Sequence, residues 1–160
     1  MHGWLLLLLV VAAVVVARAV AVTPVTVSSE SMVPTLARGD VVLVDKAVWR
    51  LRGPHRGELV VFDAADHQRS LKRMVAVGGD TVEIRDAILY VNGRRVPEPY
   101  VDHSRIDGLY FGPVRVPDDR VFVLGDNRSN SIDSRAYGPV ARGALIGTAV
   151  LGLWPTHTIG

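Results

Sequence analysis

A continuous apolar run near the N-terminus constrains this chain more than any other feature. Residues 4–22 contain a single charged side chain, that of Arg18. A helix of about 20 such residues is long enough to cross the hydrocarbon core of a bilayer. Trp4 would lie at one membrane interface, and the Arg18 side chain is close enough to the other end to reach the second interface. A helix that is apolar on all faces does not suit a globular surface, so the run predicts a membrane anchor.

A cleaved signal peptide is the alternative for the same run. Ala19-Val20-Ala21 has the small-x-small pattern of a cleavage site. However, no Lys or Arg precedes the run, and its apolar part exceeds the usual length of about 7–15 residues. We therefore expect an uncleaved anchor over residues 1–22 and one domain over residues 23–160. The arginines that follow the run would weakly favour an inside C-terminus.

Beyond the anchor, short β-branched runs bounded by Gly, Pro or Asp predict strands. They cover residues 41–44, 59–62, 71–77, 81–84, 88–91, 121–124 and 144–153. Asn92-Gly93 is typical of a two-residue hairpin turn. Residues 97–117 are rich in turn formers and give no clear prediction, and no helical period follows the anchor. The predicted fold is mainly β, a small domain built on a bent, barrel-like antiparallel sheet.

The composition excludes several classes of function. Without cysteine, the chain cannot have a disulfide, a catalytic thiolate or a cysteine-ligated zinc. A net charge of +2, with no basic run interleaved with aromatics, argues against a nucleic-acid partner. The sequence also lacks a GxSxG elbow, an HExxH motif and a Walker-type glycine loop.

One polar stretch, residues 125–139, is far richer in Gly, Asn, Ser, Asp and Arg than a plain turn requires. Two carboxylates, Asp126 and Asp133, alternate in it with two guanidiniums, Arg128 and Arg135. This composition predicts a loop pinned by bidentate ion pairs and side-chain hydrogen bonds. Taken alone, the stretch is equally compatible with a well-capped surface loop.

A serine-rich stretch, residues 28–36, follows the anchor and contains Ser28, Ser29 and Ser31. A serine hydroxyl becomes a nucleophile only with a base and with donors for the oxyanion. On its own, this stretch would more simply be a hydroxyl-rich linker. His67 and His103 are formally available as the base of a Ser-His-Asp triad, but no motif supports either.

Lysine occurs only at Lys46 and Lys72, and every other basic side chain is arginine. Lys72 has apolar neighbours on a predicted strand, where burial would lower its pKa and allow it to act as a general base. It could instead be an edge-strand lysine that deters aggregation. Alternation places Lys72 and Arg73 on opposite faces, so one can face inward while the other faces solvent. Lys46 ends a strand beside Asp45 and is predicted to be solvated.

Four segments together resemble the bacterial type I signal peptidases, a Ser/Lys protease family. They are residues 29–36, 39–46, 71–80 and 125–139, in the order that the family has them. The Ser-Met-x-Pro-Thr pattern is moderately specific alone. Its combination with Lys-Arg and with Gly-Asp-Asn-Arg…Ser-x-Asp-Ser-Arg is very specific. The likeness extends from about residue 28 to the end of the chain.

The resemblance implies a role for each matching position. Ser31 would be the nucleophile and Lys72 the general base. Ser29 would donate to the oxyanion, and Ser131 would orient the lysine amine. Asp133 and Arg135 would brace the site, and the remaining supporting positions would be Met32, Arg73, Asp126 and Arg128. No metal, nucleotide or other cofactor is required by this chemistry.

The resemblance also implies a membrane-bound serine endopeptidase. Such an enzyme removes N-terminal signal peptides from secretory preproteins after a small-x-small motif such as Ala-x-Ala. It would be a single-pass protein of the cell membrane with its catalytic domain on the extracytoplasmic side, and this outweighs the weak charge argument. Two alternatives stay open: a dedicated maturation protease for a single substrate or a pilin, and a non-enzymatic β module that binds exported chains.

Overall fold

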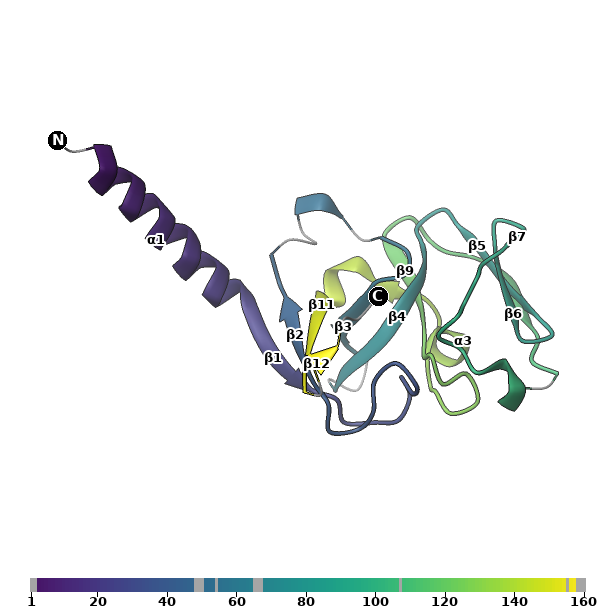
Figure 1. Cartoon of the computed structure of the whole chain (residues 1–160). Helices are drawn as coiled ribbons and strands as arrows, with labels where there is room; N and C mark the ends of the chain where they lie inside the picture. The colour runs from purple at the N-terminus through teal and green to yellow at the C-terminus, as the bar shows by residue number, and fades with distance from the viewer. Residues whose placement is uncertain are drawn as a thin grey trace.

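Antiparallel strands dominate the part of the chain that the computed structural model describes, residues 3–47, 51–53, 55–64, 68–106, 108–154 and 156–157. Every strand pairing among these residues is antiparallel. The predicted mainly β, antiparallel fold is therefore confirmed (Figure 1).

The helices and strands follow in this order: α1 (Gly3–Ala21), β1 (Val22–Thr26), β2 (Val41–Asp45), β3 (Leu59–Asp63), β4 (Arg69–Val77), β5 (Thr81–Arg85), β6 (Ile88–Val91), β7 (Arg94–Arg95), the 3-10 helix η1 (His103–Arg105), β8 (Phe111–Arg115), β9 (Arg120–Leu124), α3 (Ser134–Tyr137), β10 (Val140–Ala141), the 3-10 helix η2 (Arg142–Ala144), β11 (Leu145–Trp154) and β12 (Thr156–His157).

The described strands form two sheets. The larger has the order β1-β2-β11-β3-β4-β9-β10, with β12 paired to β11, and the smaller has the order β7-β6-β5-β8. The chain passes from the larger sheet to the smaller after β4 and returns with β9. Register shifts occur where β11 pairs with β2 and β3 and where β4 pairs with β9. Such irregularities bend a sheet, and they give the larger one the curl that the sequence predicts.

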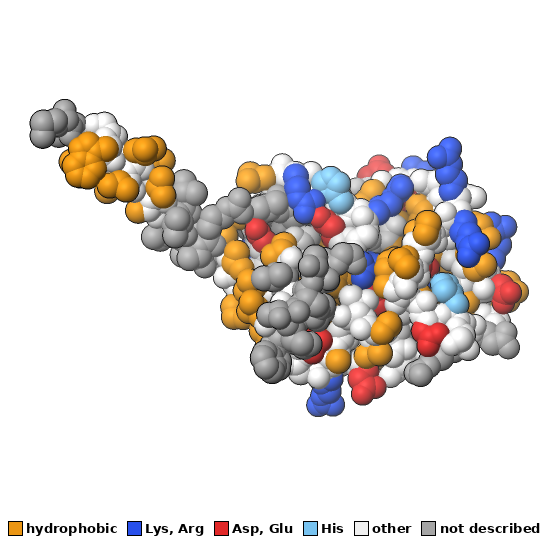
Figure 2. All heavy atoms as spheres, in the orientation of Figure 1, with side chains coloured by type: hydrophobic (Ala, Val, Ile, Leu, Met, Phe, Trp, Pro, Cys, Tyr) orange, Lys and Arg blue, Asp and Glu red, His pale blue; other side chains and the backbone are white. Residues whose placement is uncertain are grey.

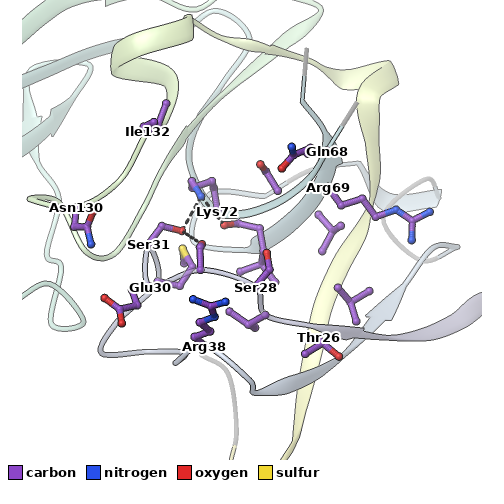
Figure 3. A pocket seen from close by; sticks show the side chains of 17 residues that line it. Thr26, Ser28, Glu30, Ser31, Arg38, Gln68, Arg69, Lys72, Asn130 and Ile132 are labelled. Carbon is purple, nitrogen blue, oxygen red and sulfur yellow. Dashed lines mark hydrogen bonds between the residues drawn. The ribbon is translucent and has the colours of Figure 1, made fainter. Parts of the chain in front are cut away.

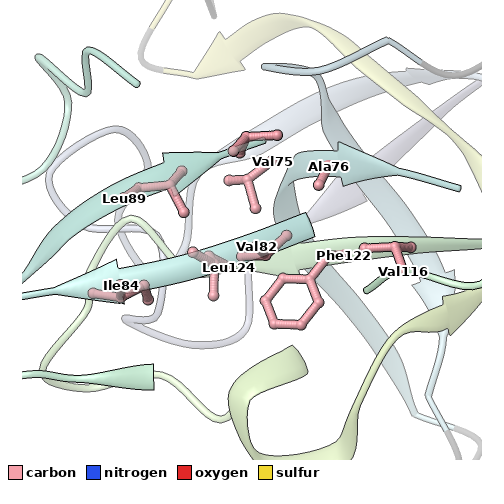
Figure 4. Packing of buried hydrophobic residues seen from close by; sticks show 9 residues of the cluster. Val75, Ala76, Val82, Ile84, Leu89, Val116, Phe122 and Leu124 are labelled. Atoms are coloured by element: carbon pink, nitrogen blue, oxygen red, sulfur yellow. The ribbon is translucent and has the colours of Figure 1, made fainter. Parts of the chain in front are cut away.

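Continuous apolar runs become strands that are buried on both faces. In β9, Val121 and Val123 belong to one buried cluster, whereas Phe122 and Leu124 belong to another. The cluster that contains Phe122 and Leu124 also takes Val82 and Ile84 from β5, so it joins the two sheets (Figure 4). Because apolar residues cover both faces of such a strand, its own sequence is apolar throughout and does not alternate between apolar and polar residues.

Two tight turns shape the smaller sheet. Asn92 and Gly93 have φ values of 54° and 73° and connect β6 to β7, as the sequence predicts. Asp86 and Ala87 connect β5 to β6 in the same way, with φ values of 49° and 63°. Alanine seldom adopts a positive φ, so this second turn has no sequence signal.

The N-terminal helix α1 has 19 residues and projects away from the β domain (Figure 1). Its first half exposes leucines and valines (Figure 2). The side chains of residues 13–20 are not described, and most of the alternative cleavage site at residues 19–21 falls among them. No helix is long and apolar enough to cross a membrane in the part of the chain that is described. The predicted span is therefore not confirmed.

Candidate active site

Ser31 and Lys72 lie in one pocket of about 680 Å³ (Figure 3). One wall is the chain that leaves β1, which includes Ser29, and the other is the start of β4. Residues 41 positions apart in the sequence thus meet through the folding of the larger sheet. Asn130 and Ile132, from the polar loop of residues 125–139, contribute a third side (Figure 3).

The amine of Lys72 and the hydroxyl of Ser31 are in hydrogen-bonding contact. Nζ lies 2.7 Å from Ser31 Oγ and also donates to the carbonyl of Leu71 at 3.2 Å. The two residues are only 5% and 7% exposed. Burial lowers the pKa of Lys72 below its ordinary value, and the nearby Asp133 carboxylate opposes part of that shift. A lysine in this setting can lose its proton and accept one from the serine.

The turn that carries Ser31 is fixed from both sides. Met32 and Leu36 are buried in the apolar cluster beneath it, and the Leu36 N–H donates to the Met32 carbonyl at 2.9 Å. From the polar loop, the Asn127 N–H donates to the Ser31 carbonyl at 3.0 Å. A Cβ at Gly125 would come within 2.6 Å of that same carbonyl, so only glycine allows this approach.

The hydroxyl of Ser29 lies beside the nucleophile. Its Oγ is 3.1 Å from Ser31 Oγ, and the residue is exposed at the pocket wall. A hydroxyl and a backbone N–H beside a serine are the kinds of group that can donate hydrogen bonds to an oxyanion.

Ser131 does not make the contact expected from the resemblance. Its Oγ is buried and has no hydrogen-bond partner among the described residues. The amine of Lys72 bonds to Ser31 and Leu71 instead. Ser131 is nevertheless close to the site, because a Cβ at Gly125 would meet Ser131 Oγ at 2.2 Å and Ser31 O at 2.6 Å.

Asp133 and Arg135 form the bidentate pair predicted for the polar loop. Arg135 Nε and Nη2 both donate to the Asp133 carboxylate at 2.8 Å. The Asp133 carboxylate also accepts hydrogen bonds from the N–H groups of Gly125 at 3.0 Å and of Arg135 at 3.2 Å. Burial alone would raise the pKa of Asp133, but Arg135 and these N–H groups outweigh it and hold the pKa below its usual value. Asp133 is therefore a fixed negative charge near Lys72.

Arg73 does not face solvent, because its residue is only 1% exposed. Nε and Nη2 donate to Asp126 at 2.9 and 2.8 Å, and Nη1 donates to the Gly57 carbonyl at 2.8 Å. The guanidinium also lies 3.8 Å from the centre of the Tyr100 ring. Alternation does put Lys72 and Arg73 on opposite faces, but other parts of the chain cover both faces of β4.

Arg128 has a partner that the sequence does not reveal. Its guanidinium makes two hydrogen bonds with Glu98, one of them at 3.0 Å, and both side chains are buried. Arg128 Nε also donates to the Gly125 carbonyl at 3.0 Å. Of the two carboxylates in the polar loop, only Asp133 therefore pairs with an arginine of the same loop. Asp126 instead connects the loop to β4, and Arg128 connects it to the segment before β8.

Of the two alternative bases, His103 is not placed to serve Ser31. His103 is exposed in η1 and does not line the pocket. His67 lies outside the described residues. Lys46, one position after β2, is partly buried and also lies outside the pocket lining.

Among the residues that the structure describes, no three His, Asp or Glu side chains are grouped as a metal site.

Comparison with known proteins gives consistent matches. The model of the family described as signal peptidase, peptidase S26, matches residues 1–154. A probable signal peptidase I-2 of Synechocystis sp. is 40% identical over 141 residues, which are 84% of this chain and 64% of that protein. A signal peptidase I of Bacillus amyloliquefaciens is 37% identical over 145 residues, which are 85% of this chain and 78% of that protein. The chain thus spans just under two thirds of the first relative.

A solved structure shares the fold. The crystal structure of a signal peptidase I from Enterococcus faecalis V583 superposes with a TM-score of 0.54 at 32% sequence identity. The match covers 59% of this chain and 95% of that one.

Proposed function

The chain belongs to the signal peptidase family, peptidase S26, and we propose that it cleaves N-terminal signal peptides from exported preproteins with a Ser31–Lys72 dyad. One observation carries the proposal: Lys72 Nζ lies 2.7 Å from Ser31 Oγ in a pocket where burial lowers the pKa of the lysine. That distance suits proton transfer, and the lowered pKa favours the neutral amine that a general base needs.

In the first step, the neutral amine of Lys72 removes the Ser31 proton as Oγ attacks the scissile carbonyl. The carbonyl oxygen becomes an oxyanion, for which Ser29 Oγ–H and the Ser31 N–H are the available donors. Removing one such donor in comparable sites costs about 10²–10³ in rate. The resulting ammonium of Lys72 is stabilised by the nearby Asp133 carboxylate.

In the second step, Lys72 gives its proton to the departing amine, which leaves an ester between the signal peptide and Ser31. A water molecule, deprotonated by Lys72 in the same way, then attacks this ester; the signal peptide leaves with a free carboxyl group, and Lys72 returns the proton to Ser31 Oγ. The Lys72 amine both accepts and donates protons in these steps, so its position must be fixed. Two elements supply that rigidity, the buried pair of Arg73 and Asp126 and the pair of Asp133 and Arg135.

We further propose that the pocket accepts only small side chains next to the scissile bond, as in Ala-x-Ala. The walls near Ser31 include the buried Met32 and the part-buried Leu71, which are held by the apolar cluster beneath the site. Such packed walls reject added volume.

The proposed enzyme works at a membrane. Residues 4–22 would anchor it in the lipid bilayer by a single span, with the catalytic domain on the extracytoplasmic side, where precursors emerge. The exposed leucines of the first half of α1 support this part of the proposal.

A fluorogenic peptide with an Ala-x-Ala site tests the activity. Purified protein should cleave it after the second Ala, and Ser31→Ala should abolish cleavage. Binding of the peptide without cleavage by the wild type would instead support a non-enzymatic module. A panel of unrelated precursors then separates a general signal peptidase from a protease dedicated to one substrate or a pilin.

A further inference from the structure

A second hollow, of about 470 Å³, adjoins the catalytic pocket. The two share Ser70 and Ile132 as lining residues. Ser70 comes two positions before Lys72 on β4, so its side chain lies on the same face of the strand as the lysine. The hollow therefore begins on the Lys72 side of the site, whereas β1 and Ser29 form the other wall of the catalytic pocket.

The surface of this hollow is mainly apolar and aromatic. Phe62 and Tyr137 form one part of it, with ring centres 6.4 Å apart and a tilt of 59° between the rings. Val140 and Ala144 continue it. Ile132 is 78% exposed and Tyr137 is 42% exposed, although both side chains are largely hydrophobic. An apolar concave surface of this kind gains free energy when an apolar side chain covers it.

The charged side chains at its rim already have partners. Arg120 Nη1 donates to the Pro139 carbonyl at 3.0 Å, and Asp63 lies 3.9 Å from the guanidinium of Arg69. The hollow thus offers no unpaired charge among its described residues, and its chemistry favours an uncharged occupant.

The proposed reaction decides which end of the substrate reaches this hollow. Lys72 must protonate the leaving amine, which belongs to the first residue after the scissile bond. That residue must consequently lie next to the amine of Lys72, on the side where the hollow begins. In this mechanism the signal peptide would then occupy the opposite side, along the chain that leads from α1 through β1 to Ser31.

We propose that this hollow is a subsite for the mature part of the substrate. It takes a bulky apolar or aromatic side chain from one of the first two residues after the scissile bond. Only one of the two can enter, because successive side chains of an extended chain point to opposite sides. The subsite rests on the proposed function and makes the enzyme selective on both sides of the cut.

Peptides with a fixed Ala-x-Ala site test the subsite. Leu or Gly is placed at the first or the second position after the cut, and kcat/KM is measured with the full-length protein in detergent. At one of the two positions, kcat/KM should be about fivefold higher for the Leu peptide than for the Gly peptide. This is a modest share of the free energy of fully burying a leucine side chain, because the hollow is open to solvent. At the other position, the two residues should be equivalent.

Three variants locate the effect. Ala144→Phe fills the hollow and should reduce the Leu-to-Gly ratio of kcat/KM to about one. Ile132→Ala removes an apolar wall and should lower the same ratio. Leu51→Ala is the matched control, since Leu51 is 88% exposed and does not line the hollow, and it should keep the wild-type ratio.

Two outcomes overturn the subsite while leaving the proposed function intact. The first is equal cleavage of the Leu and Gly peptides by the wild type at both positions. The second is a Leu preference that survives Ala144→Phe and Ile132→Ala unchanged. Absence of any cleavage by the wild type would instead contradict the proposed function itself.

Discussion

Arg73 and Asp126 form a buried bidentate ion pair on the face of β4 opposite to Lys72. The pair connects the strand that carries the proposed base to the polar loop that holds the Ser31 turn. Asp126 also accepts a hydrogen bond from Thr35, within the segment that follows Ser31. The base, the nucleophile and the loop are thus joined through one carboxylate.

Breaking this pair should destabilise the protein strongly. Asp126→Leu leaves the Arg73 guanidinium buried without its counter-ion, which typically costs about 3–5 kcal/mol. Urea unfolding of the wild type and the variant measures the difference. Glu83→Gln is the matched control, because Glu83 and Arg85 form a partly exposed pair whose loss should cost at most about 1 kcal/mol. Similar losses for the two variants would contradict the importance of the buried pair.

Replacing both partners should cost much less than replacing one. The double variant Arg73→Met with Asp126→Leu leaves no buried charge behind, and such exchanges are often close to neutral. Its free energy of unfolding should therefore recover toward the wild type, while cleavage activity should stay low because the site loses its connection. Recovery of full activity would show that the pair has no positioning role.

Asp80 should make stability depend on pH. It joins the end of β4 to β5 by accepting hydrogen bonds from Arg56 Nε and the Val77 N–H at 2.8 Å and from Asn92 Nδ2 at 2.9 Å. Burial alone would raise the pKa of Asp80, but these donors and the Arg56 charge outweigh it and lower the pKa. The stabilisation is therefore complete above the unfolded pKa of about 3.9 and is lost as pH falls through the lower folded pKa.

Asp80→Asn should consequently lower the free energy of unfolding near pH 7 by about 1–3 kcal/mol. Its stability should also fall less steeply than that of the wild type below about pH 4. Urea unfolding over a pH series measures both effects. Asp86→Asn, at an exposed turn, should leave the wild-type pH dependence in place. Parallel curves for Asp80→Asn and the wild type would contradict this account.

The positions of the strands were predictable because their apolar runs have strand length and clear boundaries. Residues 59–62 and 121–124 became β3 and β9 within one residue. The strand β8 was not predicted, since Gly112 and Pro113 interrupt its pattern. The turn at Asp86 and Ala87 was also missed, because its positive φ values are fixed by the surrounding sheet and not by a glycine.

The chemistry of the candidate site was more predictable than its supports. Ser31 and Lys72 could be selected because their motifs are local in sequence. Glu98 could not, since it lies 30 residues from Arg128 in a turn-rich segment and pairs with it only after folding. The burial of Arg73 could not be predicted either, because alternation separates the two faces of a strand without showing what covers each of them.

The side chain before the scissile bond should decide whether a peptide is cleaved. Ala or Gly at that position should be accepted, whereas Leu or Phe should reduce kcat/KM by about 5- to 150-fold, because forcing extra methylenes against packed walls costs about 1–3 kcal/mol. Competition between peptides that differ only there measures the ratio. Efficient cleavage after Phe would contradict the proposed pocket.

The proposed anchor should control membrane association but not the chemistry. The full-length protein should sediment with membranes and resist carbonate extraction. A truncated variant that begins at Val22 keeps β1 whole and should still cleave peptides, since the candidate site residues all follow it. Complete release of the full-length protein by carbonate would contradict the anchor.

The central claim is that Lys72 acts by losing its proton, and one substitution tests it most directly. Lys72→Arg keeps the charge, but arginine stays protonated at any usable pH. We expect its kcat/KM on an Ala-x-Ala peptide to fall on the order of 10³-fold or more, as for Ser31→Ala, because the two residues act as a unit. Lys46→Arg, outside the pocket, should retain most activity.

A pH series on these variants completes the measurement. Wild-type and Lys46→Arg activity should rise with pH through the lowered pKa of Lys72, since the amine must be neutral before Ser31 attacks. Lys72→Arg should stay inactive at every pH. If Lys72→Arg instead keeps near-wild-type turnover with an unchanged pH profile, the Ser31–Lys72 mechanism is wrong.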